Sequence, residues 1–206
     1  MSAMTDQVSE PHQLARPADG WTVDDLDRWP ESHERFELTD GALTMSPSPS
    51  SLHQSVSGLL FARLDATSPP DLAVTQAVEI RFGRNLTRIP DLLVVRSQEP
   101  ERHFFAPFEV VLAVEIESPG SHVEDRVVKP AIYASHGIPS FWRIELGPIR
   151  ARRYGPDGAG GYRELDCPVE RLVADVPFPV DLPLVDLLPG WSRRGVGPRH
   201  GDGPVG

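Results

Sequence analysis

The sequence predicts one domain that mixes helices with strands, and three observations support this. The chain has 206 residues, 39% hydrophobic and 24% charged, which is the composition of a globular protein with one sizeable core. Several short segments alternate apolar and polar residues, as half-buried strands do. Between them, one longer segment spaces its apolar residues at helical intervals and another opens with a helix-capping motif. Residues 1–17 and 192–206 are polar or rich in Gly and Pro, so we expect disordered tails around a domain at 18–191.

The first elements are expected to be a short helix and a hairpin. Thr22 precedes two aspartates that would lie in a first helical turn, where the helix dipole favours acids. The run 35–45 alternates around Asp40-Gly41, a dipeptide that favours a tight hairpin turn. Glu37 would lie on the first strand of this hairpin.

A helix and three strands should follow. His53 and the apolar residues of 52–64 recur at helical spacing, which predicts an amphipathic helix. Alternation over 74–82 predicts a half-buried strand. The segment 90–95 begins with proline, which the start of a strand tolerates, and predicts a buried strand. The run 109–117 is the most apolar in the chain, so we expect a central strand that ends in acids.

The C-terminal half is expected to contain one helix and a strand meander. Ser121 with Glu124 three residues later forms a capping box that opens a helix toward Gly137, and Pro130 should kink or divide that helix. The segment 141–165 contains three successive short strands separated by turns. Residues 181–188 are expected to form a short closing helix.

Charge and composition limit the classes of function. The formal net charge of −10 argues against broad, non-specific affinity for nucleic acid. A single cysteine, Cys167, can form neither an internal disulfide nor a thiolate metal site. The chain has no secretory pattern and no apolar run of the roughly 20 residues that span a bilayer, so we expect a soluble cytoplasmic protein without membrane contact. Two arginine groups predict either basic islands or solvated strand faces: Arg81, Arg84 and Arg88, and Arg143, Arg150, Arg152 and Arg153.

Lys129 is the only lysine among twenty basic residues. Arginine replaces lysine well on a surface, but it offers no compact ammonium whose pKa responds to burial. One interpretation is therefore that Lys129 has a chemical role, and the other is that an arginine-rich sequence retained one surface lysine by accident.

Acidic residues are expected to converge at one edge of the sheet. Glu115 and Glu117 lie two residues apart on a strand and so share a face, and Asp91 begins another buried strand that can pair beside it. Two unit charges about 4 Å apart repel by roughly 4 kcal/mol at an effective dielectric of about 20, so such a cluster needs a cation or a shared proton. Mg²⁺ or Mn²⁺ suits an all-oxygen site. The alternative is that these acids only cap strand ends in solvent.

These residues resemble a known nuclease signature. Pro90-Asp91 followed by Glu115-Ile116-Glu117 at the end of an apolar strand is similar to the PD-(D/E)XK motif. A longer ordered set, over about residues 21–190, resembles the Uma-two family of restriction-endonuclease-like proteins. This set comprises the segments 36–47, 90–95, 113–121 and 137–142, with His53, Asp125, Arg126, Lys129 and Tyr133.

The resemblance implies an α/β, restriction-endonuclease-like core with a central mixed sheet flanked by helices. It also implies a site that hydrolyses phosphodiester bonds of DNA with Mg²⁺ or Mn²⁺, and a possible homodimer. Asp91, Glu115 and the carbonyl of Ile116 would hold the metal, and Glu37 would be a third acid in the pocket.

The chain departs from the signature at Glu117, where the superfamily has lysine. Either Lys129 reaches the site from the following helix, or the site lacks its cation and the chain is a non-catalytic binding or assembly protein. His53 could orient Glu37 or a phosphate, although packing in the core is the alternative. Tyr133, four residues after Lys129, could border the pocket or belong to the core. The chain lacks a Gly-x-Ser-x-Gly elbow, which argues against serine hydrolysis.

Overall fold

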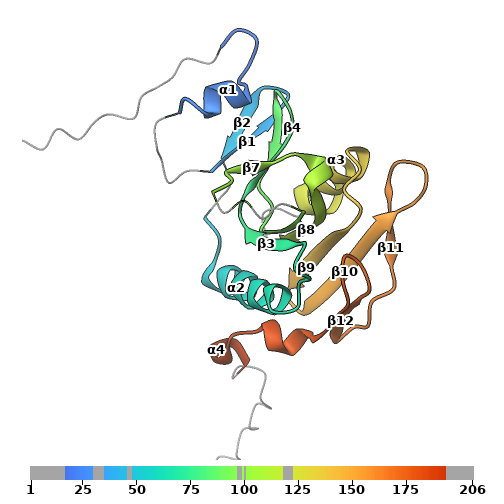
Figure 1. The fold of residues 1–206 in the computed structure, drawn as a ribbon. Coiled ribbons are helices and arrows are strands. Elements are labelled where there is room, and N and C mark those ends of the chain that lie inside the picture. The colour runs from blue at the N-terminus through green and yellow to red at the C-terminus, as the bar shows by residue number, and fades with distance from the viewer. Residues whose placement is uncertain are drawn as a thin grey trace, which may run out of the picture.

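The computed structural model describes residues 17–29, 35–45, 48–96, 99, 101–117 and 123–193, and Figure 1 shows its fold. The predicted tails therefore lie almost wholly outside the described residues. At the C-terminal boundary, a short helix α4 (Gly190–Arg193) overlaps the first two residues of the expected tail. None of the helices in the described ranges is long and apolar enough to cross a membrane.

A six-stranded mixed sheet forms the centre of the fold. Its order is β11-β10-β9-β8-β6-β3, and all neighbouring strands are antiparallel except the parallel pair β8 and β9. This confirms the expected central mixed sheet. The strands are β3 (Ala73–Gln76), β6 (Leu92–Val95), β8 (Val110–Ile116), β9 (Phe141–Leu146), β10 (Ile149–Pro156) and β11 (Tyr162–Leu165).

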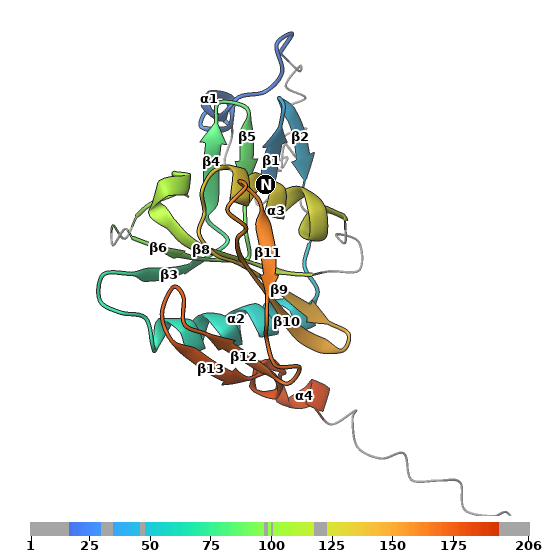
Figure 2. The same ribbon diagram turned by 90° about the vertical axis from the view of Figure 1, so that its right-hand side faces the viewer.

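Alternation along the central strands builds a core on each face of the sheet. Leu92 and Val94 pack into the cluster that contains the apolar face of helix α2 (Ser51–Asp65), whereas Leu93 and Val95 pack into the opposite cluster with Tyr133. Every residue of β8 is buried, as expected of a strand covered on both faces. Figures 1 and 2 show α2 on one side of the sheet and helix α3 (Lys129–Ser135) on the other.

Three smaller sheets surround the centre. The predicted hairpin is β1 (Phe36–Thr39) with β2 (Ala42–Met45), and Asp40 and Gly41 at its turn have φ values of 49° and 75°. These are the left-handed conformations that such a tight turn requires. The other two sheets are β5-β4-β7 and β12-β13. Their strands are β4 (Glu79–Gly83), β5 (Leu86–Arg88), β7 (Phe104–Phe105), β12 (Arg171–Ala174) and β13 (Val180–Pro183).

The single strand predicted over 74–82 is wrong, because the chain there forms two strands in different sheets. β3 joins the central sheet and β4 joins the three-stranded sheet, and Ala77 between them has a φ of 55°. The Ala77 N–H donates to the carbonyl of Asp91 at 3.1 Å, which anchors the turn. The apolar alternation continues across this turn, so the pattern alone does not reveal it.

The closing helix predicted over 181–188 is only partly correct. Its first residues belong to β13, where Val180 and Leu182 are buried and Asp181 between them is exposed, the period of a strand. A 3₁₀ turn follows, η3 (Leu184–Leu187). Pairing with β12 therefore outweighs the local helical pattern.

The predicted helix toward Gly137 is divided as its proline suggests. A π-helical segment, η2 (Glu124–Val128), leads directly into α3, and Pro130 lies at the N-terminal end of α3, where a missing N–H costs least. Ser121 of the expected capping box, together with His122, lies outside the described residues. The short helix α1 (Val23–Leu26) begins after Thr22, whose N–H and hydroxyl donate to Asp25.

Candidate active site

The pairing of β6 with β8 brings the predicted acids together. Leu92 lies opposite Val114, so continuing this antiparallel register by one residue sets Asp91 opposite Glu115. Residues in such positions have their Cβ atoms roughly 5 Å apart. Two carboxylates that are 24 positions apart in the chain therefore meet at one edge of the central sheet.

Glu115 is buried, and different side chains hold its two oxygens. Lys129 Nζ lies 2.8 Å from Oε2, and the Tyr133 hydroxyl donates to Oε1 at 2.6 Å. Burial raises the pKa of Glu115 to about 8; Lys129 acts against this rise, and the carboxylates of Asp91 and Asp125 add to it. The charge of Lys129 therefore only partly offsets the effects of burial and of the neighbouring carboxylates on Glu115.

Lys129 points into the site, with a side chain that is only 12% exposed. Its Nζ lies 3.3 Å from Asp125 Oδ1 as well as next to Glu115. Burial opposes a charge on this amine, but Glu115, Glu37 and Asp125 outweigh burial and raise its pKa. Lys129 therefore stays a cation, and it can act by its charge and by donating hydrogen bonds, not as a base.

Asp91 is oriented by its neighbours at the end of the strand. The N–H of Ile116 donates to Asp91 Oδ2 at 2.7 Å, and His53 Nε2 lies 3.2 Å from the same oxygen. Burial opposes protonation of His53, but the Asp91 carboxylate and the Ile116 carbonyl outweigh it and raise the histidine pKa. His53 thus supports Asp91 and not Glu37, the partner considered from the sequence.

Glu37 lies close enough to the site for its charge to act on Lys129, but no hydrogen bond joins it to the other described acids. Its Oε1 accepts from the N–H of Ile89 at 2.8 Å, and its side chain is buried. Its charge contributes to the raised pKa values of Lys129 and Tyr133. The hairpin β1-β2 therefore adds a third acid near the pocket, and a hydrogen bond from the Ile89 N–H fixes its carboxylate.

The donor chemistry of this pocket fits a hard divalent cation. Asp91, Glu115 and the carbonyl of Ile116 offer carboxylate and carbonyl oxygens, the ligands that Mg²⁺ and Mn²⁺ prefer. A cation bound there would also oppose the burial and the neighbouring carboxylates that raise the pKa of Glu115. Within the described ranges, no three His, Cys, Asp or Glu side chains form a metal-binding group. The ligand set expected from the sequence includes only two side chains, with a backbone carbonyl as its third member.

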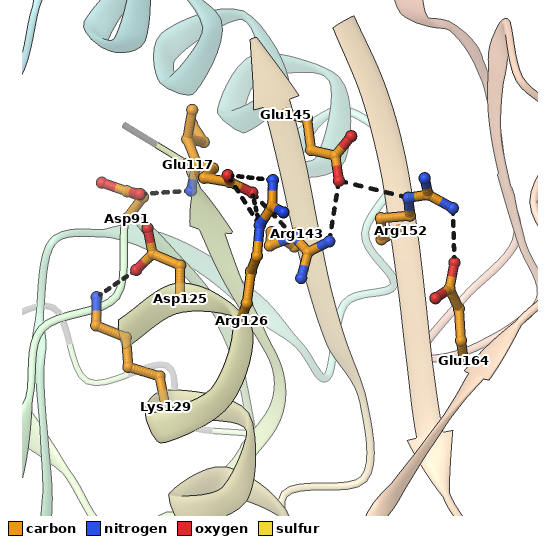
Figure 3. A network of polar contacts seen from close by, with 10 residues as sticks. Asp91, Glu117, Asp125, Arg126, Lys129, Arg143, Glu145, Arg152 and Glu164 are labelled. Atoms are coloured by element: carbon orange, nitrogen blue, oxygen red, sulfur yellow. Dashed lines mark hydrogen bonds and ion pairs between the residues drawn. The ribbon is translucent and has the colours of Figure 1, made fainter. Parts of the chain in front are cut away.

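Glu117 does not take the place of the signature's lysine in the pocket. Its buried carboxylate binds Arg126, with Nη2 at 2.6 Å from Oε1, and Arg143, with Nε at 3.2 Å from Oε2. Figure 3 shows this group beside Asp125 and Lys129. The charge reversal at position 117 is therefore matched by two arginines.

The two predicted basic islands are largely neutralised by local partners. Arg88 is buried and donates to the carbonyls of Thr87 and Leu38, so it is not on the surface. Arg81 pairs with Asp27 and Glu79. In the second group, Arg143 and Arg152 both lie against carboxylates.

A polar hollow of about 210 Å³ lies beside Asp91. Asp91 forms part of its wall, and Gln54, Gln76, Ser57 and Arg35 contribute polar groups to the lining. Gln76 Nε2 donates to Ser57 Oγ at 2.8 Å, which ties β3 to α2. Solvent and small polar groups can thus approach Asp91 from this side.

Asp125 was not assigned a role in the pocket from the sequence, whereas Tyr133 was expected either at the border of the pocket or in the core. Asp125 pairs with Lys129, and Tyr133 both packs in the core and binds Glu115. Asp125, Lys129 and Tyr133 are spaced four apart, a spacing that places side chains on one helical face and could have predicted this grouping. His136 packs against Phe82, whose ring also stacks on Tyr133.

Comparisons with known proteins agree with this architecture. A family model described as "Putative restriction endonuclease", Uma2, matches residues 23–194. A crystal structure described as "a putative nuclease belonging to DUF820", from Anabaena variabilis, superposes with a TM-score of 0.65 at 20% identity, covering 81% of this chain and 96% of that one. No curated protein matches the sequence. The family match extends over most of the chain, and the chain belongs to the Uma2 (Uma-two) family of nuclease-like proteins.

Proposed function

We propose that this protein is an endonuclease that hydrolyses phosphodiester bonds of DNA with Mg²⁺ or Mn²⁺. One observation carries the proposal: the ammonium of Lys129 lies 2.8 Å from Glu115. The strand register sets Asp91 opposite the same glutamate. An acid pair with one buried lysine is the combination on which the nuclease signature depends. The family match to restriction-endonuclease-like proteins supports the same class of activity.

Asp91, Glu115 and the carbonyl of Ile116 would hold the cation in this proposal. Bound there, it would act as a Lewis acid on phosphoryl oxygens and lower the pKa of an attacking water. The protein's own groups prepare the site: Tyr133 holds Glu115, and the Ile116 N–H with His53 holds Asp91. Side chains held in this way need little rearrangement to bind a ligand.

Lys129 would stabilise charge on the phosphate. Three carboxylates raise its pKa, so the ammonium is present at neutral pH. Negative charge increases on the nonbridging oxygens as the bond to the incoming oxygen forms, and a fixed ammonium nearby stabilises that state more than the substrate. Loss of one such donor typically lowers the rate by about 100-fold or more.

A cleavage assay on supercoiled plasmid tests the proposal. The wild type should produce nicked and linear DNA with Mg²⁺ or Mn²⁺ and no product with chelator. Asp91→Ala and Lys129→Ala should each be slower by at least about 100-fold, whereas Arg171→Ala, in the remote β12-β13 hairpin, should match the wild type. Equal rates in all four proteins would reject the assignment.

Two observations favour a second candidate, a non-catalytic binding or assembly protein on the nuclease scaffold. Both Glu115 oxygens are already hydrogen-bonded within the chain, and Glu117 replaces the signature's lysine. Such a protein would bind nucleic acid or another macromolecule through the same face. Wild-type protein that is folded, binds divalent metal and cleaves neither DNA nor RNA would favour this candidate over the nuclease.

A further inference from the structure

Six charged side chains of alternating sign form a chain of ion pairs that starts at Arg126 and Glu117 and extends away from the acid pocket. Arg126 contacts both oxygens of Glu117 through Nε, at 3.0 and 3.1 Å, and one of them through Nη2 at 2.6 Å. Arg143 Nε lies 3.2 Å from Oε2 of the same carboxylate. Figure 3 shows the chain continuing across β9 and β10. Its later links join Arg143 to Glu145 at 2.9 Å, Glu145 to Arg152 at 3.4 Å, and Arg152 to Glu164 at 2.9 Å.

This chain of ion pairs is balanced in charge. Three arginines, Arg126, Arg143 and Arg152, face the three carboxylates of Glu117, Glu145 and Glu164. Because the largely buried Arg143 also contacts Glu117, the Glu117 carboxylate keeps a cation beside it if Arg126 engages another anion. A buried carboxylate left without a partner would be costly, and this arrangement avoids that cost.

Arg126 is the arginine of this group that is both exposed and next to the acid pocket. Its side chain is 47% exposed, compared with 9% for Arg143; Arg152 is 41% exposed but pairs with Glu145 and Glu164, farther along the group. Glu117 engages its Nε and Nη2, and among the described residues Nη1 has no hydrogen-bond partner. A guanidinium anchored on one edge presents its other donors in a fixed direction, a geometry that suits phosphate oxygens.

The position of Arg126 relates it to the acid pocket. The preceding residue, Asp125, pairs with Lys129 in the pocket, whereas Arg126 pairs with Glu117. Two consecutive residues of η2 therefore contact the pocket and Glu117. Glu115 lies in β8 and Glu117 directly follows its last residue, Ile116; side chains two residues apart lie on one face of an extended backbone. Figure 3 shows Arg126 directly beside Asp125.

We infer that Arg126 binds a backbone phosphate of nucleic acid next to the bond proposed for cleavage, and that Glu117 positions the guanidinium for it. The choice of nucleic acid as the ligand rests on the proposed function. Glu117 would then be a positioning residue. Lys129 would take the part of the signature's lysine, and Glu117 in the lysine position would add an anchored guanidinium beside the pocket.

The test measures binding separately from cleavage. A short fluorescent DNA duplex is titrated in Ca²⁺, with gels to check that it stays intact, for the wild type, Arg126→Ala and Arg171→Ala. Arg171 is a matched control because its side chain is 43% exposed and pairs with Asp181 at 2.6 Å, in the β12-β13 hairpin. Arg126→Ala should weaken binding by about 10-fold and reduce the slope of log K against log salt by about 1, while Arg171→Ala changes neither.

Two further variants test the role of Glu117. Glu117→Gln removes a negative charge, so a purely electrostatic effect would tighten DNA binding, whereas loss of positioning weakens it. Arg126→Lys keeps the positive charge but lacks the planar, two-pronged guanidinium. Compared with Arg126→Ala, it should recover the wild-type salt slope but not the full affinity. Thermal unfolding of each variant verifies that it is folded. Tighter binding by Glu117→Gln would overturn the positioning role.

The outcomes separate this inference from the proposed catalysis. If the wild type cleaves DNA while Arg126→Ala binds as the wild type does, the inference alone fails. If binding depends on Arg126 but the wild type does not cleave, the inference stands and the catalytic proposal fails. Equal losses in Arg126→Ala and Arg171→Ala, or no nucleic-acid binding by the wild type, would overturn the inference.

Discussion

Tyr133 connects the core to the chemistry of the site. Its ring is buried among apolar residues, and its hydroxyl donates to Glu115 at 2.6 Å. Tyr133→Phe keeps the ring and leaves a buried carboxyl oxygen without this donor, which should lower the free energy of unfolding by about 1–3 kcal/mol. Chemical denaturation measures the change.

Tyr162→Phe is the control for this prediction. The Tyr162 hydroxyl also makes a 2.6 Å hydrogen bond, but its acceptor is the carbonyl of Ile138, outside the acid pocket. It should cost about 1 kcal/mol and leave divalent-metal affinity unchanged, whereas Tyr133→Phe should lower that affinity. Equal metal affinity in both variants would contradict a role for Tyr133 in holding Glu115.

Glu79 makes stability depend on pH. Burial raises its pKa above the usual value of 4.5, and Arg81 acts against this rise. Just above pH 4.5, the folded protein therefore keeps a proton that the unfolded chain has lost, so stability falls as pH rises through this window. Glu79→Gln should remove this contribution while Arg81 keeps its contact with Asp27.

Urea unfolding at several pH values from about 4.5 to 7 measures the effect. The stability of the wild type relative to Glu79→Gln should decline as pH rises, until Glu79 is ionised in the folded protein. Parallel curves for the two proteins, or a difference of the opposite sign, would show that burial does not raise the pKa of Glu79.

At the scale of elements, two glycines should respond in opposite ways to alanine. Gly41 has a φ of 75°, and a Cβ there would lie 3.0 Å from the Cα of Gly20. Gly41→Ala should therefore destabilise the protein by about 2 kcal/mol or more, from left-handed strain together with a backbone clash. Gly58 lies on the exposed side of α2 with open space around it, so Gly58→Ala should stabilise the helix by about 1 kcal/mol. Thermal and urea unfolding of both variants check these signs, and a stable Gly41→Ala protein would contradict the described turn.

Most elements could be predicted from local patterns, and the exceptions have physical causes. The Asp40-Gly41 turn follows from turn chemistry, α2 from helical periodicity and β8 from its continuous apolar run. The break at Ala77 could not be predicted, because alternation continues through it and only sheet pairing divides the strand. The strand β13 was predicted as helix because its pairing with β12 is not visible in a local window.

At the scale of the whole molecule, the family resemblance predicted the mixed central sheet, and the register of that sheet explains the site. The expectation that Asp91 and Glu115 lie close together depended on their strands being neighbours, which the structure shows. The partners of these acids were harder to predict. Arg126 and Arg143 come from η2 and β9 and meet at Glu117 only in the folded chain, so sequence patterns could not pair them.

The central claim is that Asp91 and Glu115 share one divalent cation beside Lys129, and calorimetric titration with Mn²⁺ tests it most directly. We expect the wild type to bind one ion at this site, and Asp91→Asn and Glu115→Gln each to lower the affinity by at least about 10-fold. Glu164→Gln, at the far end of the ion-pair chain, should bind as the wild type does. Absence of binding by the wild type, or equal affinity in all four proteins, would contradict the account.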